Sequence, residues 1–535
     1  MRKRAVNLVL VWLVFFIVFS LGQASIRVFW SNDDPYYHAR HSALINETGN
    51  LTLVEPWLTM HFLSYAPTDP WWGFHAAMAF FIHFFGVVWG SKILSALLAA
   101  SAFAIFYFIL VAHKVSKPLL WTVIFWGSSV ALLSRLLLER PHLLTLPVLM
   151  LAWHLGSCRR YWWLFALSIV YTLAYHLAPL IMVIIAAQLF IDYWFKRQFD
   201  LKLLMAALGG ILGGILLHPQ SLNYVYVMFV EIWQVLYLRF SGINLNIGGE
   251  MITMPFWKLL QNVALPLIFY LPTAAAFLAF RKDWPLQHSS RLHVLGVISA
   301  AWLVVALVVP RAATEYWLPF AWLFSALTWS VILSTADGER IKNYFNEFIT
   351  TKITRPFIYA LVAVLLAVNI VNLTLDIREA NTNPMPGQIK EAAEWLSSHT
   401  PEQSVVFYDN WSYWPLMFYY NQRNRYLTGM EPTLAYEYNH DLYWTWRNIS
   451  VNGFVCDRSD GCPRSSIYLA VAGVADAIRN KFQSEHILVK NDANSWLYKV
   501  LVARKQDFVK VFGNDGFVIY KILAPHPTPP QPSPW

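Results

Sequence analysis

Long apolar runs, separated by short polar or basic segments, make up most of the first 375 residues. A helix that crosses a bilayer needs about 20 predominantly apolar residues. The first run covers about 6–21 and follows three basic residues. The other runs lie at roughly 92–112, 118–134, 142–157, 161–178, 179–195, 201–217, 257–280, 293–310, 312–334 and 356–375. This pattern predicts a polytopic α-helical membrane protein with about eleven transmembrane helices in residues 1–375.

The charges between these runs assign each connecting segment to one side of the membrane. The six segments that we expect inside are all basic, from Arg2 at the N-terminus to Arg340 and Lys342 near the last run. By the positive-inside rule the N-terminus is cytoplasmic, and an odd number of spans places the C-terminus outside. A cleaved signal peptide is the alternative for the first run. We expect a multi-pass protein of the cell (inner) membrane.

Two of the expected external segments are long. The first external loop, 25–91, contains an aromatic, histidine-bearing stretch at 71–85, which predicts helices lying along the membrane interface. The second, 218–256, has two glycines directly before Glu250. Glycines beside an acidic residue favour a mobile external loop that orders over a ligand, and a plain flexible loop is the alternative.

The pattern changes after about residue 376, where apolar and polar residues alternate at shorter intervals. We expect an extracytoplasmic α/β domain over 376–524 and a disordered, proline-rich tail over 525–535. The predicted elements of the α/β domain are helices at 388–398 and 475–482 and strands at 404–408, 467–471 and 516–522.

Composition agrees with a membrane protein. Hydrophobic residues make up 57% of the chain and charged residues 13%, against roughly 25% charged in soluble domains. The net charge of +9 comes from short clusters between apolar runs, which argues against a nucleic-acid partner. Three cysteines are too few for a disulfide scaffold or a cysteine zinc site. Cys456 and Cys462 form either a small disulfide loop or two free thiols, and Cys158 lies on the expected inner side.

Charged residues beside a membrane span are energetically costly and tend to be functional. The polar clusters at the expected outer surface are therefore candidates for catalysis or binding. The first cluster follows the first run and contains Asp33, Asp34, His38 and Arg40. Two adjacent carboxylates with a nearby histidine predict a site for a divalent cation. The alternative is a helix cap, with Pro35 as the first helical residue.

The second cluster, Arg135, Glu139, Arg140 and His142, lies between the third and fourth runs. Glu139 and His142 are three residues apart, so one helical face can present both. The alternative is an interfacial salt bridge between Glu139 and one of the two arginines.

A third cluster opens a late run, with Arg311, Glu315 and Tyr316. An arginine on the outer side departs from the positive-inside pattern, and a guanidinium binds phosphate well. Pairing of Arg311 with Glu315 is the alternative. The sequence lacks the G-x-x-x-x-G-K-[ST], H-E-x-x-H and G-x-S-x-G motifs, so a nucleotide-driven pump is disfavoured.

These clusters, in this order, resemble the C-type (GT-C) integral membrane glycosyltransferases, and in particular the oligosaccharyltransferase catalytic subunit of the archaeal and bacterial single-chain type. Residues 34–40 match the family's D-x-Y-x-x-x-R context, in which the Asp binds a catalytic metal. The stretch 393–406 is similar to the start of the family's soluble domain. Two motifs differ: the second loop lacks D-x-D, and YDNWSYWP at 408–415 stands in place of the acceptor motif W-W-D-x-G.

The resemblance implies a role for each candidate residue. It implies metal binding by Asp34, Glu139 and His142, catalysis by Asp33, Asp34 and Glu250, donor-phosphate binding by Arg40, Arg311 and Tyr316, and acceptor binding by Trp411, Tyr413 and Trp414. The implied reaction moves a sugar or oligosaccharide from a polyprenyl-(pyro)phosphate-linked donor to a glycan, lipid or protein acceptor outside the membrane. The implied cofactor is Mg²⁺ or Mn²⁺. The alternative function is a transporter or a lipid-linked sugar flippase, although the spans are largely uncharged.

Overall fold

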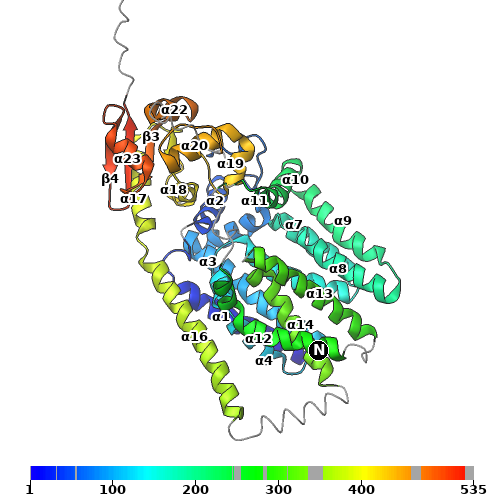
Figure 1. Cartoon of the computed structure of the whole chain (residues 1–535). Coiled ribbons are helices and arrows are strands. Elements are labelled where there is room, and N and C mark those ends of the chain that lie inside the picture. The colour runs from blue at the N-terminus through cyan, green and yellow to red at the C-terminus, as the bar shows by residue number, and fades with distance from the viewer. Residues whose placement is uncertain are drawn as a thin grey trace, which may run out of the picture.

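The fold was analysed in a computed structural model of the chain. The structure describes residues 2–31, 33–54, 57–243, 245, 255–280, 286–309, 311–334, 354–459 and 471–523. A helical domain forms most of the molecule, and a smaller domain containing a β-sheet lies at one end of it (Figure 1). The long helix α16 (Thr354–Thr382) leads from the helical domain to the smaller one. The N-terminus lies at the end of the helical domain away from the C-terminal domain.

Helices form at each of the predicted apolar runs. The helices before the first long connection are α1 (Arg2–Ala24), α2 (Asp34–Thr48), α3 (Trp72–Ala112), α4 (Pro118–Gly127), α5 (Val130–Leu136), α6 (Thr145–Ser157), α7 (Tyr161–Ala174), α8 (Leu180–Lys196) and α9 (Leu201–Leu217). Those that follow are α10 (Ser221–Phe229), the π-helix η3 (Val230–Gln234), α11 (Val235–Phe240), α12 (Phe256–Phe280), α13 (Leu286–Val308), the π-helix η6 (Ala313–Trp317) and α14 (Leu318–Ile332).

The predicted number of spans is not confirmed. Four helices are long and apolar enough to cross a membrane within the described residues: Ala5–Ala24, Trp72–Ala112, Asn262–Phe280 and Ser289–Val308. The pair α4 and α5, bent by 87°, would make a fifth. Helices α6 to α9 have only 13 to 17 residues, or about 20–26 Å at 1.5 Å per residue. They are therefore shorter than the apolar thickness of a typical bilayer.

Helix α3 contains a sharp turn that the sequence pattern did not predict. Gly86 has φ 75° and ψ 168°, which interrupts the helix after the stretch expected at the interface. Four residues later, a Cβ on Gly90 would lie 2.5 Å from the backbone nitrogen of Ile82. Both positions therefore require glycine, one for its backbone conformation and one for close packing. The turn separates a first helical arm from the longer arm that runs through the bundle.

The C-terminal domain is built around a five-stranded mixed sheet with the order β2-β1-β3-β5-β4. Strand β1 pairs in parallel with β2 and β3, whereas β5 pairs antiparallel with β3 and β4. The strands are β1 (Val405–Tyr408), β2 (Arg425–Tyr426), β3 (Ser484–Lys490), β4 (Phe508–Gly513) and β5 (Phe517–Ile522). The helices are α17 (Met385–His399), α18 (Trp414–Tyr420), α19 (Pro432–Tyr438), α20 (His440–Asn452), α22 (Val474–Lys481) and α23 (Trp496–Ala503).

This domain confirms the predicted α/β character and changes its details. The predicted helices at 388–398 and 475–482 and strands at 404–408 and 516–522 form. Most of the predicted strand 467–471, and all of the proline-rich tail, lie outside the described residues. Strands β2, β3 and β4 were not predicted. Helix α16 continues past residue 376, so the connection between the domains comes after Thr382.

The first external loop joins the two domains. Leu58 forms a parallel bridge with Tyr426, and the Thr59 and Met60 amides donate to the carbonyls of Tyr426 and Leu427 at 2.8 and 2.7 Å. Helix α2 packs against α18, with the rings of Tyr37 and Trp414 5.0 Å apart. Both aromatic residues are buried. The segment that begins at Asp34 is therefore held between the helical domain and the C-terminal domain.

Candidate functional site

Helix α2 starts at the first predicted cluster. Asp33 occupies the position before the helix and accepts a hydrogen bond from the Ser31 hydroxyl, while Pro35 lies in the first turn. The carboxylate of Asp34 lies 2.5 Å from Nη2 of Arg140. Both side chains are only partly exposed. Asp34 therefore does not act only as a helix cap, because its carboxylate also forms an ion pair with Arg140 of the second predicted cluster.

The residues of the second cluster contact two different groups of residues. Arg140 pairs with Asp34, and Arg135 pairs with the buried carboxylate of Glu315. His142 donates through Nε2 to the carbonyl oxygen of Arg135, 2.9 Å away. Glu315 therefore pairs with Arg135, a partner that the sequence analysis did not consider. These contacts join the second cluster to both the first and the third.

Glu139, the acidic residue of the second cluster, does not join these ion pairs. Its side chain is fully buried, and neither carboxylate oxygen has a hydrogen-bond partner of normal geometry. Gln23 and the Trp30 backbone lie close to the carboxylate without completing such a bond. Burial raises the pKa of Glu139 to about 8, although the charge of Lys92 opposes this. The predicted salt bridge of Glu139 with Arg135 or Arg140 does not form, because both arginines pair elsewhere.

Arg311 lies directly before η6, and its charge acts on groups from both domains. It lowers the pKa of Glu231 in η3 and of Glu431 at the start of α19, in each case against a larger effect of burial. The charge of Asp34 in turn raises the pKa of Glu231. These effects fall off steeply with distance, so Asp34, Arg311, Glu231 and Glu431 lie close together.

Glu231 and Glu431 were missed in the sequence analysis. Both side chains are half-buried, and burial raises the pKa of Glu231 to about 7 and that of Glu431 to about 8. The Thr433 hydroxyl donates weakly to Glu431 at 3.4 Å. One signal was available: Glu231 is the only acidic residue between Asp200 and Glu250. Carboxyl groups whose pKa values are shifted in this way are typical of functional sites.

Other predicted residues have packing or ion-pair partners of their own. Arg40 forms a two-point ion pair with Glu47 on the same helix, at 2.7 and 3.0 Å, so its guanidinium is already engaged there. Tyr316 is close enough for the charges of Arg311 and Arg135 to act on it, but it is buried with its ring 4.8 Å from that of Trp302. Glu250 and the two glycines before it lie outside the described residues.

The predicted acceptor-binding aromatics belong to the packed interior of the C-terminal domain. Trp414 is fully buried against Tyr37 and Phe418. Tyr413 is buried with its ring 5.1 Å from that of Phe517, and Trp411 is half-buried. The structure gives these three side chains a packing role, and their contact with an acceptor stays a prediction.

The residues expected to hold Mg²⁺ or Mn²⁺ do not form a ligand set. Among the described residues, the groups of three whose ligand atoms lie within 4.8 Å of one another are His41, Asp69, His75 and His113, His154, Cys158. Asp34, Glu139 and His142 are not such a group. Arg140 supplies the positive charge at Asp34, and Glu139 points into a buried environment. The arrangement therefore does not fit the expected metal centre.

Comparison with known proteins supports the fold alone. No family model matches the sequence, and no curated protein matches it. The structure is similar to that of ArnT from Cupriavidus metallidurans bound to undecaprenyl phosphate, with a TM-score of 0.54, 13% sequence identity and 98% of each chain covered. The apo form of ArnT gives the same TM-score and identity, over 97% of this chain and 98% of that one. The likeness supports the GT-C fold and not the oligosaccharyltransferase branch in particular, so this chain is a membrane protein with the fold of ArnT.

Proposed function

We propose that the protein is a membrane glycosyltransferase that takes a sugar from a polyprenyl-phosphate-linked donor. The observation that carries the proposal is the convergence of Asp34, Arg140, Arg311, Glu231 and Glu431 where the helical domain meets the C-terminal domain. ArnT, which has the same fold, was solved with undecaprenyl phosphate bound. A polyprenyl-linked donor carries an anionic group, and Arg140 and Arg311 supply positive charge for it.

Arginines are the best candidates for holding the donor phosphate. A guanidinium donates paired hydrogen bonds to phosphate oxygens and keeps its charge at all physiological pH values. Arg140 pairs with Asp34, and the charges of Asp34 and Arg311 both act on Glu231, so we propose that the two guanidinium groups approach one anion. Stabilising the phosphate as it leaves with the bonding electron pair would lower the barrier to transfer.

Asp34 is the candidate base. In the proposed step an acceptor hydroxyl oxygen bonds to the anomeric carbon while the bond from that carbon to the phosphate oxygen breaks. The acceptor proton passes to Asp34, and polyprenyl phosphate leaves with the bonding electrons. The pair with Arg140 keeps Asp34 ionised until it receives that proton. The step is not routed through a metal, because the expected ligands do not meet.

The acceptor lies, in this proposal, on the outer face of the membrane. Cys456 is disulfide-bonded, which suits an oxidising compartment, while Cys158 near the basic residues Arg159 and Arg160 is free. The C-terminal domain and the N-terminus lie at opposite ends of the helical domain, as the proposed topology requires (Figure 1). Because 408–415 lacks the W-W-D-x-G motif, we favour a lipid or polysaccharide acceptor over a protein.

The proposal is tested with full-length protein in nanodiscs and a radiolabelled polyprenyl-phosphate sugar. Release of polyprenyl phosphate together with labelled acceptor supports a transferase. Movement of intact donor between leaflets without cleavage would instead indicate a flippase. Lipid, polysaccharide and sequon-peptide acceptors are compared in the same assay. Omission of Mg²⁺ and Mn²⁺ is expected to leave the rate unchanged, and loss of the reaction would restore the metal-assisted mechanism.

A further inference from the structure

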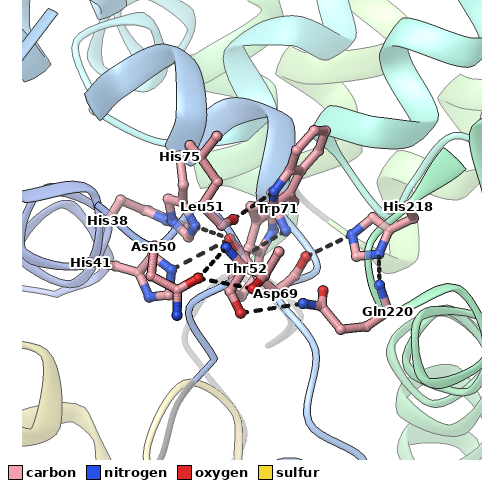
Figure 2. Close-up of polar contacts among 11 residues, drawn as sticks. His38, His41, Asn50, Leu51, Thr52, Asp69, Trp71, His75, His218 and Gln220 are labelled. Carbon is pink, nitrogen blue, oxygen red and sulfur yellow. Dashed lines mark hydrogen bonds and ion pairs between the residues drawn. The ribbon is translucent and has the colours of Figure 1, made fainter. Parts of the chain in front are cut away.

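A second buried polar group lies farther along α2, apart from the Asp34 site. It consists of His41 on α2, Asp69 in the segment before α3, and His75 in the first turns of α3. Figure 2 shows the two imidazole rings and the carboxylate converging from these separate segments. Oδ2 of Asp69 lies 2.7 Å from Nδ1 of His75 and 3.5 Å from Nε2 of His41. His41, Asp69 and His75 have exposed fractions of 0%, 2% and 0%, so these polar groups face one another in the interior and not the solvent.

The chemistry of this histidine–aspartate group is that of metal ligands. Oδ2 of Asp69 faces one nitrogen of each imidazole ring, so one oxygen and two nitrogen ligand atoms meet at one point. Two imidazoles and one carboxylate form a donor set that suits Zn²⁺ better than Mg²⁺, which prefers oxygen ligands alone.

The surrounding contacts orient these ligand atoms. The Trp71 amide donates to Oδ1 of Asp69 at 3.0 Å, which leaves Oδ2 directed at the two histidines. Nε2 of His75 lies 2.8 Å from Nδ1 of His38, so the second ring nitrogen of His75 also has a partner. Ligand histidines in metal sites are fixed in this way through the nitrogen that does not bind the ion. The rings of His41 and His75 stack at 4.3 Å, which keeps both close to Asp69.

We propose that His41, Asp69 and His75 form a Zn²⁺ site, with His38 orienting His75. In a tetrahedral zinc site, ligand atoms are separated by about 3.3 Å. The 3.5 Å separation of His41 and Asp69 is close to this value, and the 2.7 Å separation of His75 and Asp69 opens by about half an ångström when the ion replaces the shared proton. His75 then carries its proton on Nε2 and donates it to Nδ1 of His38, whose own proton shifts to its Nε2, so the number of protons is unchanged.

Such an ion would fix the geometry of the first external loop. It would tie α2 to the segment before α3 and to α3 itself. His218, at the end of α9, already donates to the carbonyl oxygen of Asp69 at 3.1 Å, so a fourth element meets the same point. His41 lies seven residues after Asp34, which is close to two helical turns, so both occupy one face of α2.

The test measures zinc in full-length protein purified in detergent through a tag that contains no histidine. Metal content by mass spectrometry is expected to be about one Zn²⁺ per chain after exposure to Zn²⁺ and removal of the excess. Asp69→Asn and His41→Gln are expected to lower this at least fivefold. Cys158→Ser is the matched control, because it disrupts the other group of potential ligands, His113, His154 and Cys158.

Three results would overturn the proposal. The unmutated protein takes up no zinc, or Asp69→Asn and His41→Gln retain it. The third is a loss of zinc from Cys158→Ser. The unmutated protein loaded with Co²⁺ provides a second measurement if the variants fail to fold. Visible d–d bands without a thiolate charge-transfer band support the histidine–aspartate group. A thiolate band assigns the ion to Cys158 and contradicts the proposal.

Discussion

The guanidinium of Arg140 lies 2.5 Å from the carboxylate of Asp34, although the two residues come from separate segments of the helical domain. This pair places a base and a cation at one point. We expect Asp34→Asn to reduce turnover by about 10²–10⁴-fold, because the amide cannot accept the acceptor proton. Glu47→Gln, which disrupts the Arg40 pair on the same helix, is expected to retain activity within about twofold. Equal losses in both variants would instead indicate damage to α2.

Arg311 is expected to hold the donor phosphate. Arg311→Ala should reduce kcat/KM by about 10–150-fold, since a hydrogen bond to a charged group contributes about 1.5–3 kcal/mol. Arg311→Lys should recover only part of this, because an ammonium group keeps the charge but not the paired geometry. Initial rates at varied donor concentration give both constants. Full activity of Arg311→Ala would remove Arg311 from the site.

Glu231 and Glu431 predict a pH dependence of donor binding. Their pKa values of about 7 and about 8 mean that both ionise as the pH rises through this range. The ionised carboxylates then compete with the donor phosphate for Arg311, whereas the donor phosphodiester keeps its charge. We expect KM for the donor to rise up to about tenfold between pH 6 and 9.

The double variant Glu231→Gln, Glu431→Gln should show no such rise. Glu437→Gln is the matched control: Glu437 lies on α19 and accepts a hydrogen bond from Gln234 of η3 at 2.7 Å, between the same two elements. It should follow the unmutated protein. A pH profile that is unchanged in the double variant would contradict the assignment.

Glu139 predicts a pH dependence of stability. Its folded-state pKa of about 8 lies above the value of about 4.3 expected when unfolded, so the unfolded chain loses this proton first as pH rises. The folded state therefore loses up to about 3 kcal/mol between pH 4.3 and 7, and the loss ends above pH 8. Glu139→Gln should remove this decline. Tm measured from pH 5 to 9 in detergent tests it, and parallel curves for the two proteins would refute it.

Variants of Trp414 can show whether its side chain only packs in the interior or also binds the acceptor. Its side chain is fully buried between Tyr37 and Phe418, and a Cβ on Gly429 would lie 2.4 Å from its ring. We expect Trp414→Ala to destabilise the protein by about 3–5 kcal/mol. Trp414→Phe should lower Tm less and leave KM for the acceptor unchanged. A selective increase in that KM, at unchanged Tm, would instead support a contact with the acceptor.

The sequence predicted local structure well where one pattern dominates. Apolar runs located the helices of the first domain, and the runs at 179–195 and 201–217 match α8 and α9 in length, but the pattern did not reveal that Gly86 turns α3. Strand β3 was missed, although residues 487–489 form an apolar run, because a short run is ambiguous between strand and buried helix.

The site was predictable only in part, because its residues meet through tertiary contacts. Asp34, Arg140 and Arg311 stood out since each lies in a dense local cluster of charge. Glu231 and Glu431 are isolated in sequence and become significant only where the C-terminal domain meets η3. The pairing of Glu315 with Arg135 joins residues 180 positions apart and could not be predicted without the fold.

The bridge between Leu58 and Tyr426 has a consequence for biosynthesis. Helix α2 leaves the ribosome long before its partner α18, so its aromatic face has no cover while most of the chain is still being made. The site is completed only when the C-terminal domain has been made and α18 has packed against α2. Premature termination before α18 should therefore yield an inserted but inactive protein, in which the first external loop is a target for quality-control proteases.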